Sequence, residues 1–284
     1  MRLAWLAVLA GCYHADTPAG SPCVSDADCP GGQTCVAQHC SLQGTAILDG
    51  AAVLDSAGSH DATPVDAAPS LPLIEYKTTT TATVSSDAAA TTLTIQKPSC
   101  AGGMLIASIA MGASGATTLP MYAAPPGWTL VRRSDHSTTS SLAVYTHAAA
   151  GSDTPMFTWI FDQAIEGTGW ISCYLDVDRV QPVDVETGGA IETTGPVYTA
   201  PTLTTTKPNE MIVGIIIAHT SMNQVTTWTT TLTKRVDLNN GGARSGMEGT
   251  RPIAAPGSTG VITTTASEAQ DYAIGELLVL RQAP

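Results

Sequence analysis

Four acidic residues crowd one stretch of the chain, YLDVDRVQPVDVETGG, and are the first candidates for chemistry. They are Asp176, Asp178, Asp184 and Glu186. Carboxylates at alternate positions near a strand end can converge as hard oxygen ligands for calcium. Their spacing matches neither an EF-hand loop nor a repeat-type calcium motif, and a polar loop with Arg179 paired to a carboxylate is the alternative. Calcium is thus the one cofactor with candidate ligands, and no other is predicted.

Pairs of carboxylates could also serve a glycosidase, in which two of them face each other about 5–10 Å apart. Asp162 with Glu166, or Glu186 with Glu192, could be arranged so, although solvated loop charge explains both pairs better. The elbow G-x-S-x-G of many serine hydrolases does not occur in the chain. We therefore expect no catalysis; the alternative is an extracellular glycan-active hydrolase or lyase that uses loop carboxylates.

Histidine and tryptophan side chains are the remaining candidates for a site. His136, His147 and His219 could meet around a metal, but no H-x-H or H-E-x-x-H pair occurs, so each is expected to be a surface or cross-strand residue. Exposed aromatic rings serve carbohydrate and peptide binders. Trp228 in TTWTTT is flanked only by threonine and is predicted to be an exposed ligand platform, whereas core packing is expected of the other strand tryptophans.

The N-terminus, MRLAWLAVLAGC, predicts export. Arg2 is followed by an apolar run, Leu3 to Ala10, that is too short to span a bilayer. Leu9-Ala10-Gly11-Cys12 resembles the lipobox of bacterial lipoproteins, in which the chain is cut before the cysteine and the cysteine is then acylated. The resemblance implies a signal peptide at 1–11 and a lipidated anchor at 12–22. Because Tyr13 rather than aspartate follows Cys12, it also implies an outer-membrane lipoprotein, exposed to the periplasm or the cell surface.

Export places the remaining six cysteines in an oxidising compartment. Four of them, Cys23, Cys29, Cys35 and Cys40, lie in CVSDADCPGGQTCVAQHC. The spacing lacks the C-x-x-C pairs of zinc and thioredoxin-like sites, so we predict a small module at 23–40 that two disulfides stabilise, with the three connectivities left open. Cys100 and Cys173 could form a third disulfide or remain two buried thiols.

A change in composition separates this module from the rest of the chain. Residues 41–72 are rich in Ala, Asp, Ser and Gly and contain no aromatic residue. This composition predicts a flexible linker that could reach several tens of ångströms.

From residue 73 to 284, short apolar or alternating runs recur between Pro- and Gly-rich turns. In MFTWIF the three aromatic residues fall on one face, which is the period-two pattern of a strand. LIASIA and MIVGIII are apolar on both faces, as in central strands that are buried on both sides. The pattern predicts an all-β, antiparallel sandwich of the jelly-roll or immunoglobulin-like type.

The strand region also repeats itself. TLTIQKP at 92–98 matches TLTTTKP at 202–208, and later segments match in the same order at offsets of about 103 to 110 residues. The order and spacing predict a duplicated unit with halves at 73–195 and 196–284, which could form two sandwiches or one pseudo-symmetric sandwich.

The motifs GMLIASIAMG, PPGWTLVRR, MFTWIF and GELLVLR give this region a family resemblance. It resembles secreted bacterial β-sandwich domains, often repeated, of surface and phage-tail-like proteins. The resemblance implies a surface-exposed binding or structural module and supplies no catalytic residues.

Composition narrows the partners. The chain of 284 residues has a formal net charge of −12 with scattered basic residues, which argues against nucleic acid because phosphate binding needs clustered Lys and Arg. We expect a membrane-anchored lipoprotein that presents a β-sandwich for adhesion, envelope structure or binding of an extracellular carbohydrate or protein.

Overall fold

The computed structural model describes residues 25, 33–36, 39–42, 73–85, 88–113, 118–191, 195–219, 227–239 and 244–284. The chain divides into two compact units, Met1–Val65 and Asp66–Pro284. Within the described residues there is no helix long and apolar enough to cross a bilayer. The predicted signal peptide, the anchor at Cys12 and most of the predicted linker lie outside the described residues and stay predictions.

A β-hairpin is the described part of the first unit. Strands β1 (Gln33–Val36) and β2 (His39–Leu42) pair antiparallel and place Cys35 opposite Cys40. Cys35 is disulfide-bonded. Cys23 and Cys29 lie outside the described residues, so the connectivity of the module stays open.

The second unit confirms the all-β prediction: its described residues fold as antiparallel strands. The first half contains β3 (Glu75–Val84), β4 (Ala90–Gln96), β5 (Met104–Ala113), β6 (Tyr122–Ala123), β7 (Thr129–His136), β8 (Ser140–Ala148) and β9 (Met156–Leu175). The second half contains β10 (Val183–Ile191), β11 (Gly195–Ala200), β12 (Thr204–Thr205), β13 (Glu210–His219), β14 (Trp228–Thr230), β15 (Thr233–Asn239), β16 (Arg244–Ile253), β17 (Gly257–Ser258), β18 (Ile262–Gln270) and β19 (Tyr272–Leu280).

Both halves have the same topology. The large sheet of the first half has the strand order β3-β9-β5-β8-β7, and that of the second half has the order β10-β19-β13-β16-β15. β4 and β6 pair with the first part of the long strand β9, and β11 and β14 pair with β18, which precedes β19. Each half therefore forms its own sandwich of one large and one small sheet.

Register irregularities recur at matching places in the two halves. The shift between Leu130 and Arg132 in β7 matches the shift between Lys234 and Val236 in β15. The β3–β9 and β4–β9 pairings carry shifts that also return in β10–β19 and β11–β18. A bulge changes the twist of a strand at a set position, so these shifts fix the residue-by-residue equivalence of the halves.

The boundary predicted between the halves is wrong. The repeat begins again at β10, so the halves divide within residues 176–182, between β9 and β10, rather than at residue 195. The sequence hid this strand because β10, VDVETGGAI, has two adjacent glycines and few apolar residues, whereas its counterpart β3 is rich in threonine.

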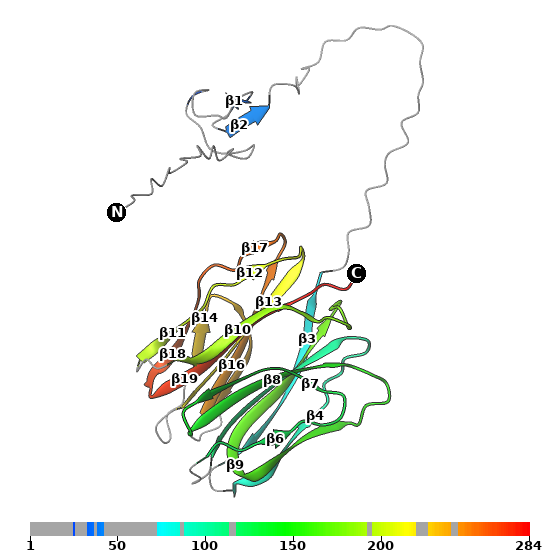
Figure 1. The fold of residues 1–284 in the computed structure, drawn as a ribbon, viewed down its shortest axis with the longest axis vertical. Helices are drawn as coiled ribbons and strands as arrows, with labels where there is room; N and C mark the ends of the chain where they lie inside the picture. The colour runs from blue at the N-terminus through cyan, green and yellow to red at the C-terminus, as the bar shows by residue number, and fades with distance from the viewer. Residues whose placement is uncertain are drawn as a thin grey trace, which may run out of the picture. The chain divides into compact units, whose positions relative to one another are not determined.

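Figure 1 shows the strands of the second unit as ribbons. Three apolar layers hold these strands together. One layer contains residues of β5, β8 and β9 together with residues of β13, β15 and β19, and so lies between the two large sheets. A second layer fills the first sandwich. The third lies inside the second sandwich and is split into two separate clusters.

A buried glutamate joins the two sandwiches. Glu248 of β16 is fully buried, and its carboxyl oxygens accept hydrogen bonds from Trp170 Nε1 at 2.7 Å and from the Tyr174 hydroxyl at 2.6 Å, both on β9. Burial raises the pKa of Glu248. The equivalent position of the first half is Val144, so this polar contact belongs to the junction and is not part of the repeat.

Replacing Glu248 tests this contact. Glu248→Leu leaves the Trp170 N–H and the Tyr174 hydroxyl buried without an acceptor, so we expect the free energy of unfolding to fall by about 2–5 kcal/mol. Glu248→Gln retains an acceptor and should lose less. Urea unfolding measures both variants, and a Leu variant as stable as the parent would show that the contact is not needed.

Candidate functional site

The second sandwich contains a cavity of about 290 Å³ between its large and small sheets. Residues of β10, β13, β16 and β19 line it on the side of the large sheet, and residues of β11 and β18 line it on the side of the small sheet. Most of the lining side chains are apolar, and four glycines, Gly188, Gly189, Gly214 and Gly275, add bare backbone. The cavity borders both apolar clusters of this sandwich.

The first sandwich shows why this space is open in the second. In the first half, the pairs that follow the bulge of the small sheet include Leu93 with Trp159 and Ile95 with Phe157. At the matching positions the second half has Tyr198 with Thr264 and Ala200 with Ile262. An indole and a branched aliphatic side chain in the first half are therefore replaced by a threonine and an alanine in the second.

Glycines on the large sheet confirm the difference in filling. A Cβ atom added to Gly169 in the first half would lie 2.9 Å from side-chain atoms of both Leu93 and Ile95. At Gly275, the counterpart, the nearest side-chain atom would be Ile191 Cδ1 at 3.3 Å. A Cβ atom on Gly189, the neighbour of Gly275 in the sheet, would meet nothing within 4 Å.

Tyr198 supplies a polar group beside this apolar space. Its side chain is buried, lines the cavity and lies 6.0 Å from the ring of Trp228. Its hydroxyl has no hydrogen-bond partner among the described residues. Burial and the nearby charge of Asp271 raise the pKa of Tyr198 to about 12, so the hydroxyl keeps its proton at neutral pH.

Trp228 is not the exposed platform that the sequence predicts. The side chain is 1% exposed and belongs to the core of the second sandwich. Its register partner on β18 is the buried Ala266. The flanking threonines misled the prediction, because a strand places alternate residues on opposite faces and one inward ring suffices for the core.

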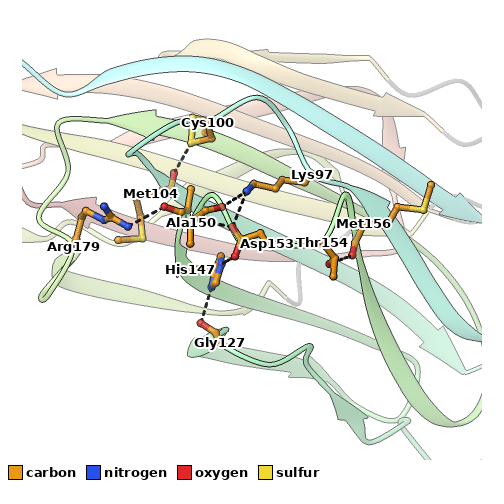
Figure 2. A network of polar contacts seen from close by, with 12 residues as sticks. Lys97, Cys100, Met104, Gly127, His147, Ala150, Asp153, Thr154, Met156 and Arg179 are labelled. Carbon is orange, nitrogen blue, oxygen red and sulfur yellow. Dashed lines mark hydrogen bonds and ion pairs between the residues drawn. A yellow bond between two sulfur atoms is a disulfide. The ribbon is translucent and has the colours of Figure 1, made fainter.

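In the first sandwich a polar network closes the loop before β9 (Figure 2). Asp153 accepts hydrogen bonds from Lys97 Nζ at 2.8 Å, from the Ala150 N–H at 2.8 Å and from His147 Nε2 at 3.0 Å. His147 Nδ1 lies 2.8 Å from the Gly127 carbonyl oxygen, which can only accept. Both ring nitrogens of His147 thus face oxygen atoms of this network.

A disulfide fastens the same end of the first sandwich. Cys100 and Cys173 are bonded, with their Cα atoms 5.6 Å apart, and so one of the two alternatives open from the sequence is realised. The position equivalent to Cys173 in the second half is Val279. Like the filled core, this cross-link distinguishes the first sandwich from the second.

Three of the four acidic residues predicted for calcium have separate side-chain partners. Asp178 accepts the N–H groups of the next turn, which lowers its pKa, and Glu186 pairs with Arg132 at 2.9 Å. Asp184 accepts from the N–H and hydroxyl of Thr206. Asp176 takes a left-handed backbone conformation, φ 59°. Throughout the described part of the chain, no three His, Cys, Asp or Glu side chains form a group that could hold a metal.

Of the two carboxylate pairs considered for a glycosidase, only Asp162 with Glu166 is described in full, and each of these two has another partner. Asp162 accepts the Met121 N–H at 2.9 Å, whereas Glu166 lies 3.3 Å from the guanidinium of Arg244. Glu192 lies outside the described residues. The side chains of Asp162 and Glu166 thus stabilise local structure.

Sequence reasoning missed a pair of carboxyl groups with opposite pKa shifts. Burial and the charge of Asp184 raise the pKa of Glu210 to about 7, whereas hydrogen bonds from Thr206 outweigh burial and lower the pKa of Asp184. Such a split is typical of acid and base partners in enzymes. Glu210, however, is only 1% exposed, which keeps it from a substrate.

The three histidines do not meet. His136 and His219 stack on Tyr272, with ring centroids 4.0 Å and 5.0 Å away, whereas His147 belongs to the Asp153 network.

Comparison of the chain with protein-family models, curated proteins and solved structures finds no match. The cavity itself could have been noticed only by aligning the halves strand by strand, which sets Trp159 against Thr264.

The Asp153 network has a defined pH dependence. Burial alone would raise the pKa of Asp153, but the bonds from Lys97, Ala150 and His147 lower it to about 2. A carboxyl group whose pKa is lower in the folded state stabilises the fold at pH values above its ordinary pKa. This stabilisation is lost as the pH falls toward 2. Asp153→Ala should therefore lose about 2 kcal/mol at pH 7 and approach the parent near pH 2.

Urea unfolding at both pH values measures this difference. The exposed pair of Glu75 with Lys77 gives the matched control, because Glu75→Gln should change stability by less than about 1 kcal/mol. An Asp153→Ala variant with the same deficit at both pH values would contradict an ionic role.

Proposed function

We propose that this chain is an envelope-anchored binding protein whose second sandwich binds a small apolar molecule. The observation that carries the proposal is the cavity of about 290 Å³ at positions that the first sandwich fills with its own side chains. Small-molecule pockets begin at about 300 Å³, and an apolar cavity of about 150 Å³ already admits benzene. Binding rather than catalysis suits a lining that consists mostly of aliphatic side chains and glycines, with Tyr198 and Glu276 as its ionisable members.

In this proposal the first sandwich has a structural role and the second binds the ligand. The first has a filled core, a disulfide and the Asp153 network, and acts as the rigid support. The second lacks the equivalent disulfide and contains the space. Because Trp228 is buried, an open aromatic surface for carbohydrate finds no support at that position.

The anchor follows from the lipobox resemblance of Leu9-Ala10-Gly11-Cys12. Acylation of Cys12, with a palmitate-type chain on its amine or thiol, would hold the protein at the outer membrane, and the linker at 41–72 would hold the sandwiches clear of the surface. A ligand of this protein would then be met in the periplasm or outside the cell.

Replacing Cys12 tests the anchor. Cys12→Ser removes the acylation site, so we expect the protein to leave the membrane fraction and appear in the soluble fraction of an expressing bacterium. Immunoblots of both fractions measure this, with the parent chain as the control. Unchanged membrane association of Cys12→Ser would contradict lipidation.

Thermal unfolding with three small ligands of different shape tests the binding site. The full chain carrying Cys12→Ser is heated with n-decanol, camphor and indole, which stand for a flexible chain, a globular aliphatic and a planar aromatic. A ligand that binds only the folded state raises the unfolding temperature. At a ligand concentration of one hundred times its Kd, the free energy of unfolding rises by about 2.7 kcal/mol. We expect at least one of the three to do so.

A variant with the space filled provides the control. Ala200→Ile restores the side chain that Ile95 supplies in the first half, and should remove the shift, whereas Thr263→Ile, on β18 but outside the cavity lining, should retain it. If none of the three ligands raises the unfolding temperature, or if Ala200→Ile leaves the shift unchanged, the cavity is not the binding site.

A further inference from the structure

The first sandwich shows which shape this position of the fold accepts. The indole ring of Trp159 is 0% exposed and lies between the large and small sheets, with ring contacts to Trp128 at 5.3 Å and to Tyr145 at 6.1 Å. Its Nε1 has no hydrogen-bond partner among the described residues. Packing alone therefore holds a flat bicyclic ring here.

The second sandwich has the same strands and register around this position, but neither the ring nor its two aromatic neighbours. Thr264 stands in the place of Trp159 and lines the cavity. The counterparts of Trp128 and Tyr145 are Leu232 and Gly249, as the matching bulges of β7 and β15 establish. Leu232 takes up part of the space above Gly249, since a Cβ atom there would lie 2.8 Å from Leu232 Cβ. The rest stays open.

Two further features suit a flat ligand. The space lies between two packed sheets, so its depth is set by the separation of the layers and favours a ring over a globular molecule. The side of the large sheet includes the adjacent glycines Gly189 and Gly275; a Cβ atom on Gly189 would meet nothing within 4 Å, whereas Ile191 Cδ1 lies near Gly275. On the small sheet, the buried Tyr198 hydroxyl has no partner among the described residues and could accept one N–H.

We infer that the second sandwich binds a planar bicyclic aromatic molecule of the indole class, at the place that the ring of Trp159 occupies in the first sandwich. This rests on the proposed function and adds the class of ligand. The bound molecule would occupy the space that the Trp159 side chain occupies in the first sandwich. Thr264, the counterpart of Trp159, leaves that space open because its side chain is small.

Calorimetric titration of the full chain carrying Cys12→Ser compares indole with n-decanol and camphor. We expect indole to bind at one site per chain with a Kd at least tenfold lower than that of either other ligand. Thr264→Trp supplies the ring covalently and should abolish indole binding. Thr263→Trp, whose position lies on the same strand outside the cavity lining, is the matched control and should bind as the parent does.

The outcomes separate this inference from the proposed function. Binding of n-decanol or camphor in preference to indole overturns the ligand class and leaves the cavity as a binding site. Binding of none of the three overturns both. Unchanged indole binding by Thr264→Trp overturns the location; should that variant fail to fold, Ala200→Ile decides the same question, because it narrows the same space by a smaller change.

Discussion

Both faces of each large sheet must be covered by other strands, and the rest of the structure depends on which strands cover them. Central strands such as β5 and β13 are apolar on both sides, and such strands need a packed layer on each side. The large sheets cover one face of each other, and the small sheets cover the opposite faces. Glu248, bound by Trp170 and Tyr174, sets a polar contact into the shared layer.

Repetition of one unit under this constraint gives an internal standard for packing. Each position of the second sandwich can be compared with a position that has the same strand, register and bulge in the first. A cavity in one half is then a departure from a filled core, at a place where Thr264 and Ala200 stand for Trp159 and Ile95. A void of this kind costs stability, and a role in binding gives a reason for it.

The residue pattern within each strand was enough to predict the fold. Features that depend on which residues of different strands pack together could not be predicted from the sequence. The both-sided apolar runs and the alternation in MFTWIF indicated the sandwich, and the repeat could be followed by eye. The weak strand β10 hid the start of the second half, and Trp228 was misplaced because its neighbours are all threonine. The cavity depends on which small residues the two facing sheets bring to one space, such as Thr264 and Gly275, and the sequence of a single strand does not show this.

A crystal structure of the full chain with 5-bromoindole tests the central claim most directly, because bromine is located by its anomalous scattering. We expect one strong bromine peak between the large and small sheets of the second sandwich, beside Thr264, and none in the first sandwich. A peak only on the surface, or no peak in crystals that diffract well, would contradict a ligand in the place of the missing ring.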